Sequence, residues 1–219
     1  MIVVTVPHAH CWKPVGPEEN KIQDWKRGPC DKLAAPAAEI LRKWYLPRAH
    51  FLLADICRSE IDLNRAPSRK VTPFRRQLTE LVQKGRVAAV LDLHSYGTNA
   101  HGRIGSIAFP DPLVILEPPP KKGKEKEKEK EDLPCLAPSP SRFASYMREC
   151  IYRETGFKPR IFNSTLGDIP KEMQEVGVPC LTIELRSSLD EKSLHLFMSA
   201  IATGYRQGFE KNAHTVRVH

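Results

Sequence analysis

Short apolar runs rich in β-branched residues alternate along the chain with segments whose apolar residues recur at helical spacing. The runs with strand character are residues 1–8, 49–56, 87–93, 105–109, 159–163 and 179–185. The helical segments are residues 31–45, 73–84, 141–155, 168–176 and a long terminal helix that ends near residue 210. Strands that alternate with helices favour an α/β fold, in which a mostly parallel sheet is covered by helices on both faces.

Residues at the element boundaries support this assignment. Thr72 precedes the second helix and Gly85 follows it, as expected of an N-cap and a helix stop. The sequence Ser188-Leu-Asp-Glu191 fits the capping-box pattern for the start of the terminal helix, with Ser188 as the N-cap. Residues 87–93 are apolar on both faces, so we expect this strand at the centre of the sheet.

Residues 117–141 differ in kind from the rest of the chain. Prolines, a Lys-Lys-Gly-Lys sequence and a Glu-Lys alternation cannot build a packed core. We interpret this segment as a solvated insertion loop, although a Lys/Glu alternation can also form a solvated helix. The chain of 219 residues is long enough for one substantial core, so residues 1–219 are predicted to form a single domain that carries this insertion.

Composition and charge narrow the class of protein. The chain is 41% apolar and 27% charged, which is ordinary for a globular protein. Its net charge of +8 comes from dispersed basic residues rather than a compact basic block, which argues against a nucleic-acid partner. The six cysteines form no C-x-x-C pair and are expected to be reduced thiols. Without a signal-peptide pattern or a run of about 18 apolar residues, we expect a cytoplasmic protein with no membrane partner.

Four apolar runs end in side chains capable of chemistry. They are Ile2-Val-Val-Thr-Val-Pro-His8, Ile61-Asp-Leu-Asn-Arg65, Val90-Leu-Asp-Leu-His-Ser-Tyr96 and Leu181-Thr-Ile-Glu-Leu-Arg186. In an open α/β sheet, ligands bind in the crevice beyond the carboxyl ends of the strands. Neighbouring strands of this kind would bring two histidines, a carboxylate and an Asn-Arg pair into one pocket. That is the outline of a hydrolytic metal site.

His8 and His94 are the predicted metal ligands, because each follows an apolar strand. A catalytic zinc ion takes three protein ligands from His, Glu or Asp and keeps a fourth position for water. Asp31, at the start of the first helix, is the preferred third ligand, and its alternative role is a helix cap. His10 would compete for the same position if the chain stayed extended, although Pro7 favours an end to that geometry.

Glu184 is the predicted general base. It lies in an otherwise apolar stretch, where a carboxylate is costly to bury unless it is paired or faces a cleft. Partial desolvation raises the pKa of a glutamate, which suits it to take a proton from water and return it to a leaving group. The alternative is a salt bridge to a neighbouring arginine. Asp92, two residues before His94, would either orient that imidazole or bond loop amides.

Asn64 and Arg65 supply an amide and a guanidinium on adjacent residues. Arginine binds a carboxylate through two parallel hydrogen bonds, so this pair is predicted to bind a carboxylate of the substrate. Arg58, earlier in the same loop, is close enough to donate to a developing oxyanion.

The order Pro-His, Asp-Leu-Asn-Arg, Asp-Leu-His-Ser-Tyr and Ile-Glu-Leu-Arg resembles the N-formylglutamate amidohydrolase family, which is related to zinc carboxypeptidases and aspartoacylase-like deacylases. The resemblance spans Val6 to Arg186 without the insertion. It implies a three-layer, zinc-carboxypeptidase-like (phosphorylase/hydrolase-like) fold with a mixed sheet. It also implies zinc-dependent hydrolysis of an amide bond next to a free carboxylate, in an N-acyl amino acid or at a peptide terminus.

The chain departs from the carboxypeptidase pattern at one ligand. Carboxypeptidases place a glutamate three residues after the first histidine, where this chain has Cys11. The third ligand therefore stays open among Asp31, His10 and a cysteine, Cys11 or Cys30. The same departure leaves room for a second hypothesis, in which a degenerate family member binds a carboxylate-bearing ligand without turnover.

Overall fold

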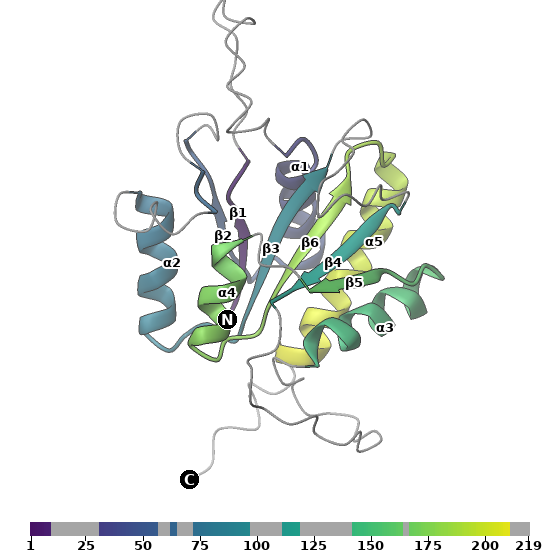
Figure 1. Ribbon diagram of the computed structural model, residues 1–219. Helices are drawn as coiled ribbons and strands as arrows, with labels where there is room; N and C mark the ends of the chain where they lie inside the picture. Colours follow the sequence, from purple (N-terminus) through teal and green to yellow (C-terminus); the bar gives the residue numbers. More distant parts are fainter. Residues whose placement is uncertain are drawn as a thin grey trace, which may run out of the picture.

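The computed structural model describes residues 1–9, 31–56, 62–64, 72–96, 111–118, 142–163 and 167–210. At its centre is a six-stranded sheet with the order β2-β1-β3-β6-β4-β5 (Figure 1). The strands are β1 (Ile2–Val6), β2 (His50–Leu53), β3 (Ala89–Tyr96), β4 (Leu113–Glu117), β5 (Arg160–Asn163) and β6 (Cys180–Arg186). Neighbouring strands run parallel, except that β4 pairs antiparallel with β6. The predicted α/β fold with a mostly parallel, mixed sheet is confirmed.

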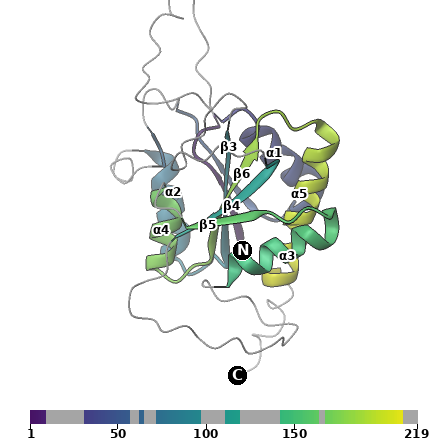
Figure 2. The same ribbon diagram turned by 45° about the vertical axis from the view of Figure 1, so that its right-hand side comes forward.

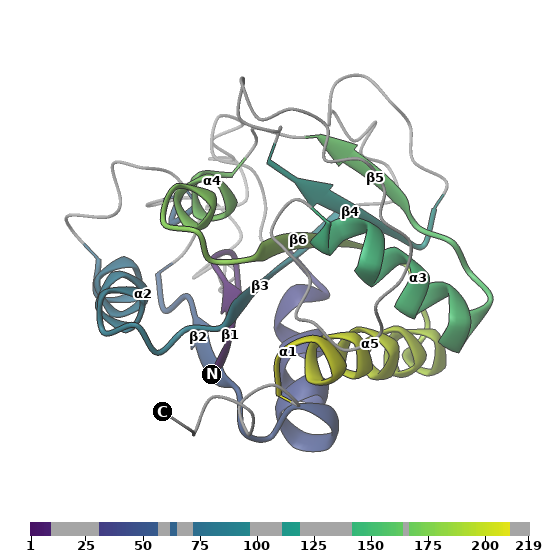
Figure 3. The ribbon, with the colours of Figure 1, turned by 90° about the horizontal axis from the view of Figure 1, so that it is seen from below.

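Helices cover both faces of the sheet (Figure 2, Figure 3). One face carries α1 (Ala34–Ile40) with its π-helical continuation η2 (Leu41–Tyr45), α3 (Phe143–Thr155), and α5 (Glu191–Tyr205) with its continuation η4 (Arg206–Glu210). The other face carries α2 (Pro73–Gln83) and α4 (Asp168–Glu175). This is the three-layer arrangement expected from the sequence. None of the helices in the described ranges is long and apolar enough to cross a membrane.

Each layer of helices packs against the sheet around its own hydrophobic core. The alternation of side chains along β3 shows which face of the sheet carries the polar residues of the site. Leu91 and Leu93 point into the larger core beneath α1, α3 and α5. Val90 points to the opposite side, into the smaller core beneath α2 and α4. Because side chains alternate along a strand, Asp92 and His94 lie on the same face as Val90. The polar residues of β3 therefore face the side of α2 and α4, beyond the end of the smaller core.

Several predicted boundaries are confirmed. The hydroxyl of Thr72 accepts a hydrogen bond from the backbone N–H of Arg75 and caps α2. Gly85 and Gly156 follow α2 and α3 with φ of 63° and 72°, a left-handed conformation that favours glycine after a helix. The strand at the centre of the predicted sheet, now β3, has β1 and β6 as its neighbours.

The predicted start of the terminal helix is wrong by two residues. Asp190, not Ser188, is the N-cap of α5, and its carboxylate accepts a hydrogen bond from the backbone N–H of Ser193 at 2.9 Å. Ser188 and Asp190 both offer a polar side chain near the start of this helix. Asp190 is the better cap because its carboxylate also accepts a hydrogen bond from the Ser193 hydroxyl at 2.8 Å, so one side chain satisfies two donors.

The stretch before the predicted insertion also differs from expectation. Residues 113–117 form β4, a strand that the sequence pattern did not predict, so Glu117 belongs to the sheet and not to the insertion. The apolar run here is only four residues long and lies between Pro112 and Pro118, so the sequence pattern assigns it to no element. The predicted strand 105–109 and the remainder of the insertion, 119–141, lie outside the described residues.

Candidate metal centre

Two backbone features bring three polar side chains to one end of the sheet. His8 follows β1 directly, and His94 lies near the carboxyl end of β3. The backbone N–H of Asp31 donates to the carbonyl of His8 at 3.2 Å, so the chain that leads into α1 is fastened to the end of β1. All three side chains are buried. Strand ends therefore position the histidines, and one backbone hydrogen bond places the aspartate beside them.

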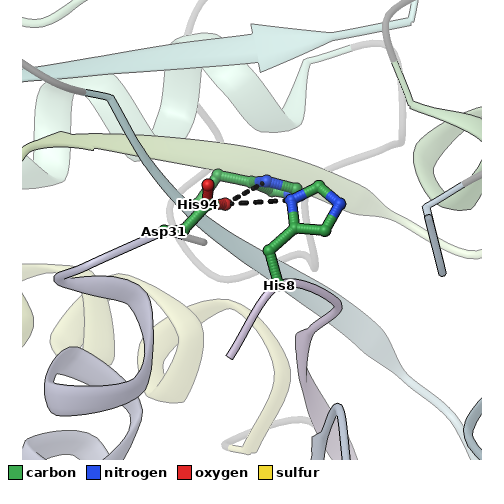
Figure 4. Close-up of side chains that lie close together, drawn as sticks. All are labelled: His8, Asp31 and His94. Carbon is green, nitrogen blue, oxygen red and sulfur yellow. Dashed lines mark hydrogen bonds and ion pairs between the residues drawn. The ribbon is translucent and has the colours of Figure 1, made fainter. Parts of the chain in front are cut away.

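One carboxylate oxygen links the two histidines. Asp31 Oδ2 lies 3.1 Å from His8 Nδ1 and 2.7 Å from His94 Nδ1 (Figure 4). The two imidazole rings meet edge to face, with their centroids 4.8 Å apart. The three potential ligand atoms all lie within 4.8 Å of one another. The three residues predicted to hold the metal are thus brought together, with the Nδ1 atom of each ring turned toward the same point.

A second carboxylate lies at the far nitrogen of each ring. Asp62 Oδ1 lies 2.8 Å from His8 Nε2, and Asp92 Oδ2 lies 3.2 Å from His94 Nε2. A carboxylate at one ring nitrogen holds the proton there and leaves the other nitrogen free to bind a metal. The expected contact of Asp92 with His94 is present. Asp62 is not among the predicted site residues, although the Asp-Leu-Asn-Arg sequence contains it.

Asp92 is itself held from both sides. Its Oδ1 accepts a hydrogen bond from the Thr5 hydroxyl at 2.7 Å, and its Oδ2 accepts one from the Thr182 hydroxyl at 3.1 Å. Thr5 and Thr182 lie on β1 and β6, the strands that flank β3. The partners of Asp92 in the described residues are therefore His94 and side chains of the two neighbouring strands rather than loop amides, and the position of the carboxylate is set by the sheet.

Hydrogen bonds and charges within the cluster strongly shift the pKa values of Asp31 and His94. Burial alone would raise the pKa of Asp31, but hydrogen bonds to His8 and His94 outweigh it and hold that pKa well below the usual range. Burial alone would lower the pKa of His94, but the carboxylates of Asp92 and Asp31 outweigh it and raise that pKa well above its ordinary value. The cluster therefore stabilises an ionised Asp31 carboxylate beside a protonated His94 imidazole. A metal cation would take the place of that proton.

The donor set is compatible with a metal ion. Two imidazole nitrogens and one carboxylate oxygen make up a three-ligand set that leaves a fourth position for water. The alternative role of Asp31 as a helix cap is not seen, because α1 has Leu33 at its N-cap position and no side-chain cap hydrogen bond. His10, Cys11 and Cys30, the competing candidates, lie outside the described residues.

Glu184 lies directly beside this cluster on the sheet. It is the register partner of His94 in the parallel pair of β3 and β6, at the usual strand spacing of about 4.8 Å. Its side chain is partly exposed, and burial raises the pKa of Glu184 to about 7 against the opposing effect of His94. Among the described residues no ion pair involves Glu184, so the alternative of a structural salt bridge has no support there. Its carboxylate can both take and release a proton near neutral pH.

The predicted substrate-binding residues are described only in part. Asn64 is buried, and its Nδ2 lies 3.3 Å from His94 Nε2. Its Oδ1 makes no hydrogen bond among the described residues. Arg58 and Arg65 lie outside the described residues, so their predicted roles at the oxyanion and the substrate carboxylate stay predictions.

A buried arginine supports the segment that carries Asp62 and Asn64. Arg75, near the start of α2, is fully buried; its Nη1 donates to the Leu63 carbonyl at 3.4 Å and its Nη2 to Glu172 Oε1 at 2.5 Å. Glu172 belongs to α4, so this guanidinium ties the segment to both helices of its face. Nothing in the sequence singles out Arg75 from the exposed Arg76 beside it, because only the packing distinguishes the two.

Removal of this guanidinium is expected to destabilise the fold. Arg75→Ala leaves Glu172 as a carboxylate with its buried partner removed, which should lower the free energy of unfolding by about 3–5 kcal/mol. Arg42→Ala is the matched control, because Arg42 pairs with Glu39 at 3.0 Å on an exposed helix surface, and such pairs contribute about 0.5 kcal/mol or less. Urea unfolding of the metal-free proteins measures both. Similar losses in the two variants would contradict the structural role of Arg75.

No family model matches the chain, and no curated protein matches its sequence. Solved structures nevertheless share its fold. N-formylglutamate amidohydrolase from Ralstonia eutropha matches with a TM-score of 0.58 at 19% identity, over 94% of each chain. N-acetylmuramoyl-L-alanine amidase from Clostridium difficile 630 matches with a TM-score of 0.51 at 9% identity, over 98% of this chain and 97% of that chain. A metallo-carboxypeptidase from Burkholderia cenocepacia matches more weakly, with a TM-score of 0.47 at 12% identity, over 93% of this chain and 55% of that chain.

The first two of these similarities confirm the predicted fold class. The chain has the fold of the N-formylglutamate amidohydrolase structure over nearly its whole length. Three of the four short sequences that carry the resemblance lie on or directly after strands of this sheet, β1, β3 and β6, whereas residues 62–64 lie outside the strands. Identity below 25% speaks for the fold alone, so an activity has to be argued from the side chains of the site.

Proposed function

We propose that this protein is a zinc-dependent hydrolase of an amide bond adjacent to a carboxylate, acting on an N-acyl amino acid or a peptide terminus. One observation carries the proposal: His8 Nδ1, Asp31 Oδ2 and His94 Nδ1 converge beside Glu184 at the carboxyl ends of parallel strands. Such a three-ligand set with an adjacent carboxylate base is the arrangement that metal-assisted hydrolysis requires. The amidase and amidohydrolase structures that share the fold are compatible with this reaction.

The residues have distinct roles in the proposed reaction. A zinc ion held by His8, Asp31 and His94 would supply Lewis acidity, which lowers the pKa of water to about 7 and polarises the scissile carbonyl. Glu184 would accept the proton of the attacking water and deliver it to the departing amine. A carboxylate whose pKa lies near 7 is suited to both transfers, because neither direction is strongly uphill.

The substrate carboxylate is assigned to Asn64 and Arg65, and the developing oxyanion to Arg58. Guanidinium groups in these two roles would favour an anionic substrate, in keeping with the net charge of +8. The carboxylate would also orient the substrate, because a planar guanidinium donates two parallel hydrogen bonds to it in one plane.

Arg65→Lys tests the carboxylate assignment. The ammonium keeps the charge but loses the two-point contact, so KM for N-acyl amino acids should rise about tenfold, equivalent to about 1.4 kcal/mol of lost binding, with kcat changed less. The measurement compares N-acyl amino acids with the matching N-acyl amino amides, which lack the carboxylate. If hydrolysis of both series suffered equally, the guanidinium would not be reading the carboxylate.

The proposed function as a whole is tested by metal analysis and a substrate screen. Purified protein should contain about one zinc per chain and hydrolyse at least one member of a series of N-formyl, N-acetyl and N-succinyl amino acids. Activity should be lost with a chelator and restored by zinc. Protein that holds zinc and binds these compounds without hydrolysing them would instead support the carboxylate-binding, non-catalytic alternative. Protein without stoichiometric zinc would contradict the metal centre.

A further inference from the structure

The start of α4 lies in unusually close contact with Asn64. Gly167 is the N-cap residue of α4, with φ of −126° and ψ of 140°, an extended conformation that any residue can adopt. The backbone therefore gives no reason for a glycine. A Cβ at this position would lie 2.9 Å from Asn64 Nδ2, 3.0 Å from Oδ1 and 3.3 Å from Cγ. The whole carboxamide of Asn64 occupies the space that a side chain at residue 167 would need.

The backbone of Asn64 is fastened to the same point. The N–H of Asp168, the first residue of α4, donates to the Asn64 carbonyl at 3.0 Å. The N–H of Asn64 donates to Asp62 Oδ1 at 3.0 Å, and this oxygen also lies 2.8 Å from His8 Nε2. One short segment thus contacts both histidines of the cluster, His8 through Asp62 and His94 through the Asn64 carboxamide. The packing of this segment against α4 therefore sets the positions of Asp62 and Asn64 relative to the two histidines.

We propose that Gly167 is a positioning residue for the metal centre: its missing side chain lets the Asn64 carboxamide pack against α4 and remain in contact with His94. The carboxamide packs beside Nε2 of His94 and so limits rotation of the ring, whose Nε2 faces Asp92 and whose Nδ1 faces Asp31. The role in metal binding rests on the proposed function, whereas the contact between Gly167, Asn64 and His94 does not. A methyl group at residue 167 would push the carboxamide away, because both of its polar atoms lie at the contact.

A double-mutant cycle in zinc affinity tests this role. Gly167→Ala should weaken zinc binding about tenfold, within the range of about 10–100-fold known for groups that orient a metal ligand. In an Asn64→Ala background the same substitution should produce no further loss, because the carboxamide that the methyl displaces is gone. Zinc affinity is measured by competition with a chromophoric chelator. An equal loss in both backgrounds, or no loss in the wild-type background, would overturn the proposal.

Gly204→Ala controls for the strain of an added methyl group. A Cβ at residue 204 in α5 would lie 2.8 Å from Met147 Sδ and 2.9 Å from its Cε, which is as crowded as the position at residue 167. The contact lies between α3 and α5, on the opposite face of the sheet from the cluster. Gly204→Ala should therefore alter the melting temperature but leave zinc affinity unchanged. A tenfold loss of affinity in this variant as well would assign the effect to general strain and overturn the proposal.

A measurement on metal-free protein separates this inference from the proposed function. Nitrogen chemical shifts of the imidazole rings report the hydrogen bonds of each histidine directly. Gly167→Ala should shift the ring nitrogens of His94 and leave those of His195, on α5, in place. If the wild-type protein bound no zinc, the proposed function would fail. The spectrum of the metal-free protein would still show whether the packing of Asn64 against Gly167 affects His94. Unchanged His94 ring shifts would overturn the positioning role.

Discussion

Glu184→Gln is expected to reduce kcat by about 10²–10⁴-fold, the range contributed by a positioned general base, while zinc remains bound. The glutamine side chain has nearly the same shape but cannot accept a proton. Glu184 lies beside His94 and is not part of the three-residue ligand set, so its neutralisation should leave metal affinity almost intact. Initial rates on the best N-acyl amino acid and metal analysis of the same preparation measure the two quantities together.

Glu117→Gln is the matched control for this prediction. Glu117 is also a partly buried carboxylate at the end of a sheet strand, and burial raises its pKa. It lies on the same face of β4 as Leu113 and Ile115, which belong to the larger core, so it faces away from the cluster. Turnover should be unchanged in Glu117→Gln. Full activity in Glu184→Gln would show that Glu184 is not the general base. Loss of zinc in that variant would show that Glu184 is a metal ligand instead.

The face and the strands of the candidate site could be predicted from the sequence for a physical reason. In a parallel sheet the carboxyl ends of the strands share one edge, so polar residues that follow apolar runs must gather there. His8, His94 and Glu184 each follow such a run, and all three meet beside one another. Strand pairing brings His94 into register with Glu184, and His8 follows β1, which pairs with β3.

The parts that escaped prediction depend on contacts between segments distant in the sequence. Asp31 is predicted as a ligand from its place at the start of the first helix, but the backbone hydrogen bond to His8 that holds it there follows from no sequence pattern. Asp62 and Gly167 matter only through a segment that packs against α4, and Arg75 only through its burial beneath the same segment. Sequence periodicity reports which face a residue occupies, but not which side chain from another element will meet it there.

His94→Ala is expected to abolish stoichiometric zinc binding and, with it, the stabilisation that zinc gives to the fold. A ligand that binds only the folded protein stabilises it by about 4 kcal/mol at a free concentration of 1,000 Kd. For a chain of this size, that corresponds to a rise in melting temperature of about 10 °C. The wild-type protein should show this rise on addition of zinc and lose it with a chelator. His94→Ala should show neither, because the cluster keeps only two of its three ligands.

His195→Ala distinguishes this effect from loss of any histidine. His195 lies on α5, where its Nδ1 is 3.5 Å from the Tyr45 hydroxyl, on the opposite face of the sheet. This variant should retain both the zinc and the rise in melting temperature. The comparison is made on metal-free protein titrated with zinc, so any change in stability caused by the substitution itself is subtracted. Stoichiometric zinc in His94→Ala would show that the metal is held elsewhere. A zinc-dependent rise of equal size in all three proteins would exclude the His8, Asp31 and His94 cluster as the site.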